Sequence, residues 1–133
     1  MDSVIRKGIA FLPEELERFD ELIKEKGYKN RSEAVRDLIR NELSKKAEHD
    51  PNKKMHGVLT IVYDHHNHSV QHNLTHIQHY AAAHVISSMH THLDEHNCLE
   101  IIVMKGKVRV IKKLADTILA MKGVTHGKLV LTG

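Results

Sequence analysis

The stretch MHTHLDEHNC, residues 89–98, places three histidines, two carboxylates and the one cysteine of the chain within ten positions. Neutral imidazole and thiolate are both ligands of transition metals. Residues two apart on a strand point to the same side, so His90 and His92 are expected to project from one face. A turn through residues 94–97 would then bring Cys98 beside His92. This set of two nitrogens and one sulfur predicts a metal site that still lacks its fourth ligand.

Helical spacing over residues 69–82 offers candidates for that ligand. His72, His76 and His79 follow one another at i, i+4 and i+7, on one helical face. His79 lies nearest the helix end and is the best candidate by position, although a solvated helix face explains it equally well. His96 is expected to be exposed in its turn. The run His65, His66 and His68 is expected to form a loop cluster that binds metal weakly or not at all.

The donor types favour nickel or copper over zinc. Structural zinc sites usually contain two or more cysteines in paired spacings, and this chain has no such pair. A strand-borne His-x-His with one cysteine on the next strand suits a flat arrangement, which is typical of Ni(II) or Cu(II). No Ser/His/Asp or Cys/His/Asn order surrounds Cys98, so it is a poor candidate for a catalytic nucleophile. We expect no enzymatic activity.

Composition sets the wider limits. With 133 residues, 41% of them hydrophobic, the chain can form one domain or two small ones with buried cores. Residues 1–50 carry 11 Lys and Arg against 12 Asp and Glu, so bulk charge does not indicate a nucleic-acid binder. Twelve of the 13 histidines follow residue 50. A single cysteine predicts a reducing, cytoplasmic setting, and no apolar run approaches the ~20 residues of a membrane span.

The first half of the chain is predicted to be a strand followed by two helices. IRKGIAF, residues 5–11, has the residue types of a short strand. A first helix should start at Pro13 and end at Gly27, and a second should follow Asn30, which forms a capping-box spacing with Glu33. A unit this small cannot bury its apolar faces alone, so we expect an intertwined dimer.

The second half has a different pattern. After a polar, turn-like linker at residues 50–54, strands and helices are predicted in the order βαββαβ, which is typical of a ferredoxin-like, antiparallel α+β sheet with both helices on one face. The predicted segments are residues 57–65, 69–82, 84–93, 98–106, 108–123 and 127–132. The expected organisation is therefore α+β, with domains at residues 1–49 and 55–133.

Taken together, the two halves resemble the nickel-responsive repressors of the NikR family. GYKNRSEAVRDLIR (27–40) is similar to the second helix of their ribbon-helix-helix domain, and IQHY with HTHLDEHNCLEIIVMKG is similar to their ACT-type regulatory domain. The resemblance implies a homotetramer, a dimer of dimers, with one Ni²⁺ per chain between subunits. The square-planar ligands would be His90, His92 and Cys98 of one chain and His79 of another. The resemblance also assigns Tyr63 and Glu100 to the surroundings of the metal, and Glu33 and Asp37 to a cation site.

The same resemblance implies how DNA is bound. Strands from two chains would pair and enter the major groove of an operator, with the side chains of Arg6, Gly8 and Ala10 facing the bases. The backbone around Asn30, Arg31 and Ser32 would bind a phosphate at the start of a helix. The chain departs from the family at Gly8 and Ala10, where a hydroxyl is common, and at Lys7, where an apolar residue is usual. The implied function is repression of nickel-uptake genes when nickel is bound.

Three alternatives stay open at this stage. An ACT-type amino-acid sensor would need a small-molecule pocket at a subunit interface and would give Cys98 no role. A metalloenzyme would need an open metal position and a general base, for which Glu100 is the candidate. A sensor of the same class tuned to copper or cobalt is equally compatible with nitrogen and sulfur ligands.

Overall fold

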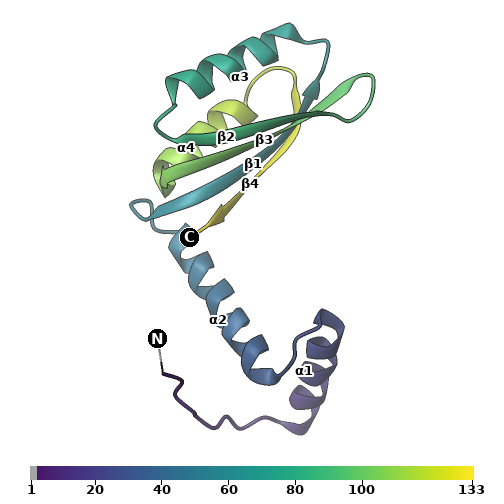
Figure 1. The fold of residues 1–133 in the computed structure, drawn as a ribbon, viewed down its shortest axis with the longest axis vertical. Helices are drawn as coiled ribbons and strands as arrows, with labels where there is room; N and C mark the ends of the chain where they lie inside the picture. The colour runs from purple at the N-terminus through teal and green to yellow at the C-terminus, as the bar shows by residue number, and fades with distance from the viewer. Residues whose placement is uncertain (1–2) are drawn as a thin grey trace. The chain divides into compact units, whose positions relative to one another are not determined.

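A computed structural model describes residues 3–133 of the chain, which group into two compact units, Met1–Glu42 and Leu43–Gly133 (Figure 1). The division falls inside one helix, α2 (Arg31–Glu48), so residues 43–48 group with the second unit. No helix among the described residues is both long enough and apolar enough to cross a membrane.

The two helices of the first unit begin and end where the sequence predicts. Helix α1 (Pro13–Lys26) has proline in its first turn and ends at Gly27, whose φ of 78° is left-handed and whose N–H bonds the carbonyls of Ile23 and Lys24. Ahead of α2, the Asn30 side chain accepts a hydrogen bond from the Glu33 N–H at 2.9 Å. The expected caps are confirmed.

The strand predicted over residues 5–11 is absent from the single chain. Residues 3–12 have no regular secondary structure, and the segment lies exposed. A lone strand has no ladder partner for its N–H and C=O groups, so its β-prone sequence alone does not make it a strand. The prediction was wrong for one chain because a strand needs a neighbouring strand to pair with, and the described part of this chain offers none to residues 5–11.

The first unit leaves most of its apolar side chains uncovered. Among its described residues only Ile23 and Ala34 are buried. Nine large apolar side chains are at least 39% exposed: Val4, Ile5, Ile9, Phe11, Leu12, Leu22, Leu38, Ile39 and Leu43, the last of which lies just past the division. Such a surface is larger than single scattered apolar residues explain.

The second unit has the predicted order βαββαβ (Figure 1). Its strands are arranged β2-β3-β1-β4, and every neighbouring pair is antiparallel. This confirms the α+β prediction. The elements are β1 (Lys54–Asp64), α3 (His68–Tyr80), β2 (Val85–His92), β3 (Asn97–Lys107), α4 (Val108–Leu119) and β4 (Val124–Thr132).

The core lies between one face of this sheet and the two helices. Alternate residues of β1 and β3 are buried on that face, as expected for a half-covered strand. Helix α4 contributes a stripe of buried residues at three- and four-residue spacing. The fully buried large side chains are Tyr63, Leu59, Ile61, Leu74, Ile102, Met104, Ile111, Ile118, Val70, Val108 and Cys98.

The opposite face of the sheet, which no element of the unit covers, carries an apolar patch beside polar pairs such as Thr60 with Lys128. Val58 pairs with Val103 on one side and with Val130 on the other, and Val62 pairs with Leu99. These side chains are half-buried by one another, and Val130 remains 52% exposed. An antiparallel sheet with a solvated face normally places polar residues there, so the apolar patch around Val58, Val62 and Val130 is a candidate contact surface.

Candidate metal centre

The candidate metal centre lies at one end of the sheet, where β1 and β2 end and β3 begins. Tyr63 of β1 and His92 of β2 both lie opposite Cys98 of β3, and His90 lies opposite Glu100. Residues directly opposite each other share a face of the sheet. Cys98 and Glu100 are buried because β3 is an inner strand, whereas both histidines are exposed because β2 is an edge strand.

The structure brings the predicted histidines and cysteine to one place. Cys98 Sγ lies 3.5 Å from His92 Nδ1, and the rings of His90 and His92 lie 5.2 Å apart between centroids. His90 Nδ1 is 3.0 Å from the Tyr63 hydroxyl, which holds that imidazole against a fully buried side chain. The turn over residues 94–97 therefore acts as expected.

A further histidine, His65, lies beside the cysteine. The sequence predicts this histidine in a separate loop cluster, outside the site. His65 Nδ1 is also 3.5 Å from Cys98 Sγ, and its ring centroid is 4.8 Å from that of His92. One donor atom from each of His65, His92 and Cys98 lies within 4.8 Å of the others. The pairing of Tyr63 with Cys98 would have revealed this, because the residue two beyond Tyr63 returns to the same side.

Backbone contacts hold the His65 loop in position. The His65 N–H donates to the His96 carbonyl at 2.7 Å, which ties the loop to the β2–β3 turn. In that turn the Asp94 carboxylate accepts the N–H groups of His96 and Asn97, both at 2.8 Å. These hydrogen bonds lower the pKa of Asp94, so the turn carries a negative charge at neutral pH.

The electrostatics around Cys98 favour a bound cation. Burial raises the pKa of the Cys98 thiol, and the carboxylates of Glu100, Asp64 and Asp94 raise it further. Burial, with Glu100 and Cys98, raises the pKa of Tyr63 to about 12. A metal ion that replaces the thiol proton would relieve this concentration of negative charge. The donor set and its charge therefore fit a divalent transition metal.

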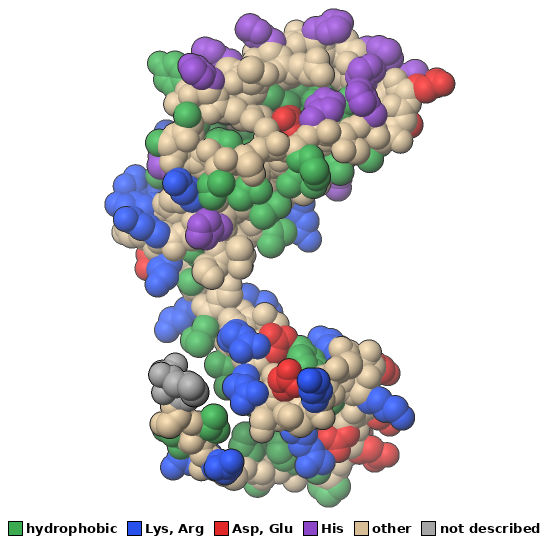
Figure 2. Space-filling view, in the orientation of Figure 1, with side chains coloured by type: hydrophobic (Ala, Val, Ile, Leu, Met, Phe, Trp, Pro, Cys, Tyr) green, Lys and Arg blue, Asp and Glu red, His purple; other side chains and the backbone are tan. Residues whose placement is uncertain are grey.

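Helix α3 is tied to this site through polar contacts of Gln71 with Tyr63 and of Gln78 with Glu100. Gln78 Nε2 donates to the nearly buried Glu100 carboxylate at 3.2 Å. The histidines of α3 are all exposed: His68, which is the first residue of the helix, His72, His76 and His79. His79 is not among the close donors of its own chain. Figure 2 shows histidine side chains gathered on the surface of the second unit.

The residues expected to contact DNA all lie in the first unit. Arg6, Gly8 and Ala10 are exposed in the segment that precedes α1. Asn30 caps α2, and the exposed Ser32 lies in its first turn.

Two of the predicted first-unit residues already have partners within the chain. The Arg31 guanidinium binds both carboxylate oxygens of Asp20, at 2.9 and 2.8 Å. Asp37, which together with Glu33 was expected to bind a cation, accepts hydrogen bonds from Tyr28 and Arg40. Those contacts lower the pKa of Asp37, most of all the bond from Tyr28.

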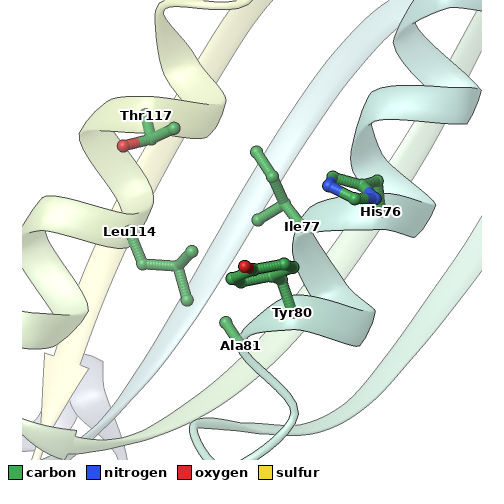
Figure 3. Close-up of a pocket in the computed structure, with 6 residues that line it drawn as sticks. All are labelled: His76, Ile77, Tyr80, Ala81, Leu114 and Thr117. Carbon is green, nitrogen blue, oxygen red and sulfur yellow. The ribbon is translucent and has the colours of Figure 1, made fainter.

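A pocket of about 320 Å³ lies between α3 and α4, away from the close donors (Figure 3). Its lining is His76, Ile77, Tyr80, Ala81, Leu114 and Thr117. An adjoining groove adds the basic side chains of His84, Arg109 and Lys113. Neither lining includes a carboxylate.

Comparisons with known proteins agree over both units. Residues 56–132 match the family described as NikR C terminal nickel binding domain, and residues 9–46 match the ribbon-helix-helix proteins of the copG family. Relatives provisionally described as nickel-responsive regulators are 47% identical in Thermococcus kodakarensis and 49% identical in Geobacter sulfurreducens. These alignments cover 98% and 99% of this chain and 95% of each relative.

One solved structure shares the fold at low identity. The uncharacterized protein TM1266 from Thermotoga maritima superposes with a TM-score of 0.54 at 18% identity, over 60% of this chain and 99% of that one.

A helical ribbon-helix-helix unit joined to an α+β unit with a His/Cys cluster defines a metal-responsive DNA-binding protein. The chain belongs to the NikR family of nickel-responsive transcriptional regulators. That family consists of regulators rather than enzymes.

Proposed function

We propose that this chain represses nickel-uptake genes in the cytoplasm when nickel is bound, as a homotetramer on double-stranded operator DNA. The observation that carries the proposal is the meeting of His92 and Cys98, with His90 beside them, on a chain that begins with a ribbon-helix-helix segment.

One Ni²⁺ per chain would be held by His90, His92 and Cys98, with His79 of a second chain as the fourth ligand. Nickel bound by three nitrogens and a thiolate acts here as a structural link rather than as a reaction centre. The edge position of β2 supports a contribution from outside, because its residues from Ile86 to His92 are exposed and no strand among the described residues pairs with its outer edge. Gln78 would carry a shift of α3 to Glu100, next to the ligands.

The oligomer is supported by two apolar surfaces that the single chain leaves open. The first is the set of exposed apolar side chains of the first unit, where residues 5–11 would become a strand by pairing with the same segment of a second chain. The second is the uncovered sheet face around Val58, Val62 and Val130. Two separate contact surfaces on each chain are what a dimer of dimers needs.

DNA would be bound by the paired strands, with Arg6 able to make a bidentate contact to guanine. Gly8 and Ala10 offer no side-chain donor, so Arg6 would carry most of the base reading. The N–H groups at the start of α2 around Asn30, Arg31 and Ser32 would bind a phosphate. A cation at Glu33 and Asp37 would have to share Asp37 with its present partners.

Nickel would act by linkage. A metal held between chains favours the arrangements in which His79 of one chain reaches the ligands of the other. If only some of those arrangements allow both DNA-binding dimers to contact one operator, nickel raises DNA affinity, and DNA raises nickel affinity by the same factor.

The test is a complementation between two inactive variants. His79→Ala keeps the three ligands of one chain, and Cys98→Ala keeps His79, so neither homo-oligomer can complete a planar site. Mixed oligomers, made by co-expression with different tags, should regain the thiolate-to-nickel charge-transfer absorption and nickel-dependent binding of an operator fragment. Both signals should be at most about half those of the wild type, because only one orientation of each pair is complete. Recovery in neither assay, with wild type active in both, would show that His79 does not act across chains.

A further inference from the structure

We propose that the pocket between α3 and α4, together with the basic groove beside it, binds a small organic acid. The apolar body of the acid would lie in the pocket, and its carboxylate would lie in the groove. Neither lining contains a residue that the proposed function uses, so this inference stands apart from nickel and from DNA.

The pocket and the groove form one continuous surface. Ala81, Leu114 and Thr117 belong to both linings, so a single ligand can extend from one hollow into the other. The pocket volume of about 320 Å³ lies within the usual range for small-molecule sites, about 300–1,000 Å³. The site is therefore large enough for a compact ligand with two chemically different ends.

The pocket end is suited to an apolar group. Leu114 of α4 faces Ile77 and Tyr80 of α3 across the space between the helices (Figure 3). Ile77 and Leu114 are half-buried and pack against the core, whereas Tyr80 is 84% exposed. The ring of His76 lies 5.5 Å from that of Tyr80, between centroids. An aliphatic or aromatic group in the pocket would remove these apolar surfaces from water, which favours binding.

The groove end is suited to an anion. Arg109 and Lys113 lie four residues apart on α4, so both side chains project from one face of the helix. Like charges at this spacing repel each other. Both side chains are exposed, and neither has an ion-pair partner among the residues that the structure describes. A carboxylate between them would relieve the repulsion and accept charge-assisted hydrogen bonds from both.

His84 is fixed at the edge of the groove. Its Nδ1 lies 3.2 Å from the Lys105 carbonyl oxygen, and the Lys105 N–H donates to the His84 carbonyl at 2.8 Å. The imidazole also lies against Gly106, where an added Cβ would come within 2.8 Å of Nδ1. Because a carbonyl oxygen only accepts, Nδ1 is the donor in that contact, and Nε2 remains for a ligand.

The charges of the second unit favour an acid at this place over an amine. Lys54 pairs with Lys107 at this end of β1 and β3, whereas Asp64 pairs with Asn97 at the other end. Asp116 is the one carboxylate of α4, and it lies outside both linings. A ligand with a negative end therefore meets cations in the groove, and a ligand with a positive end meets repulsion.

The first test compares four probes on the metal-free, full-length protein by isothermal titration calorimetry. Octanoate has both the apolar body and the charge, octanamide has the body alone, and acetate and inorganic phosphate have the charge alone. We expect one octanoate per chain, with octanamide, acetate and phosphate each at least about tenfold weaker. Acetate or phosphate that binds as tightly as octanoate would show that the groove recognises charge alone, which overturns the proposal.

The second test uses variants of exposed residues of α4. Arg109→Gln and Lys113→Gln should each weaken octanoate binding by at least about fivefold and leave octanamide binding unchanged. Lys112→Gln is the matched control, because it removes the same charge from the same helix outside both linings, and it should change neither. Thr117→Phe should fill the pocket and weaken both probes, since the Thr117 hydroxyl bonds only to the carbonyl of Lys113 in its own helix.

The remaining outcomes are decisive in the same way. Octanoate affinity that stays at the wild-type value in Arg109→Gln and Lys113→Gln, or in Thr117→Phe, would place the ligand on another apolar surface and overturn this site. Circular dichroism and the oligomeric state of each variant show whether a loss of binding reflects a loss of folding. These titrations contain neither nickel nor DNA, so a failure of the proposed function would leave their result standing.

Discussion

Tyr63 and Cys98 lie directly opposite each other on strands β1 and β3, and both side chains are fully buried. These two buried side chains fix the position of the site. His92 faces Cys98 from β2 on the other side, and the chain beyond Tyr63 returns His65 to the thiol. The central strand thus supplies the one soft ligand, and each neighbouring strand contributes a histidine at its end.

Removing the thiolate should remove the metal response. We expect Cys98→Ala to lose the thiolate-to-nickel charge-transfer absorption that appears on titrating the wild type with nickel to one equivalent per chain, because the sequence has no other cysteine. Adding nickel should then leave the affinity of the Cys98→Ala protein for operator DNA unchanged, as measured by fluorescence anisotropy. His96→Ala, in the neighbouring turn, should respond to nickel as wild type does. A nickel response that survives in Cys98→Ala would contradict the assignment of the thiolate as a ligand.

Glu100 should tune nickel affinity although it is not a ligand. It is nearly buried, lies opposite His90 and is bonded to Gln78 of α3. Glu100→Gln removes a negative charge beside the ligands, so we expect nickel affinity to fall about 10- to 100-fold, measured by competition with a chelator. Glu95→Gln changes the same charge in the exposed turn and should have little effect. Equal losses in both variants would mean that net charge, rather than position, matters.

Tyr63 should make the metal-free protein sensitive to high pH. Its folded pKa of about 12 is above the ordinary value of 10.0, so the protonated form is favoured in the folded state. The resulting stabilisation is complete below pH 10 and is lost as pH rises towards 12, on the order of 2 kcal/mol at most. Urea unfolding between pH 9 and about 12 should show a steeper loss for wild type than for Tyr63→Phe. Parallel curves would contradict the raised pKa.

The packing of α4 on the sheet should be intolerant of a methyl group at Gly57. A Cβ there would lie 2.7 Å from Ile111 Cγ2 and 3.2 Å from Leu129 Cδ1, and Ile111 is fully buried. We expect Gly57→Ala to lower the free energy of unfolding by about 1–3 kcal/mol, measured in urea. Gly8→Ala is the control, because nothing lies within 4 Å of its added Cβ. A neutral Gly57→Ala would mean that α4 can move away from the sheet freely.

Freeing Arg31 should strengthen DNA binding. Its guanidinium is bound by both oxygens of Asp20, which lowers the pKa of that carboxyl. Asp20→Ala leaves the Arg31 cation available to a DNA phosphate, so DNA affinity should rise. The slope of log affinity against log salt concentration should become steeper by about one. Glu21→Ala removes the neighbouring charge without freeing Arg31. If both variants strengthen binding alike, the gain comes from net charge and not from Arg31.

The sequence predicted the fold of the second unit well, because its signals are local. Alternation in β1 and the apolar stripe of α4 depend only on nearby residues, and both appear as expected. The strand predicted at residues 5–11 is not formed in the single chain, because an isolated strand has no ladder partner for its N–H and C=O groups. The helix caps at Gly27 and Asn30 were predictable from residue type alone.

The candidate site was predictable only where its residues lie close together in the sequence. His90, His92 and Cys98 are joined by one turn, so spacing alone brought them together. His65 was missed because its approach depends on the register between β1 and β3, across 33 residues of chain. The role of His79 depends on a second chain and remains a prediction.

The edge position of β2 also bears on how such a protein can change over generations. Its histidines are exposed at the edge of the sheet and their backbone is held by pairing with β3, so replacing one should leave the folded protein intact. Metal preference can therefore change through single substitutions, because these alter metal binding and leave stability unchanged. Cys98 has no such freedom, since its side chain is fully buried in the core.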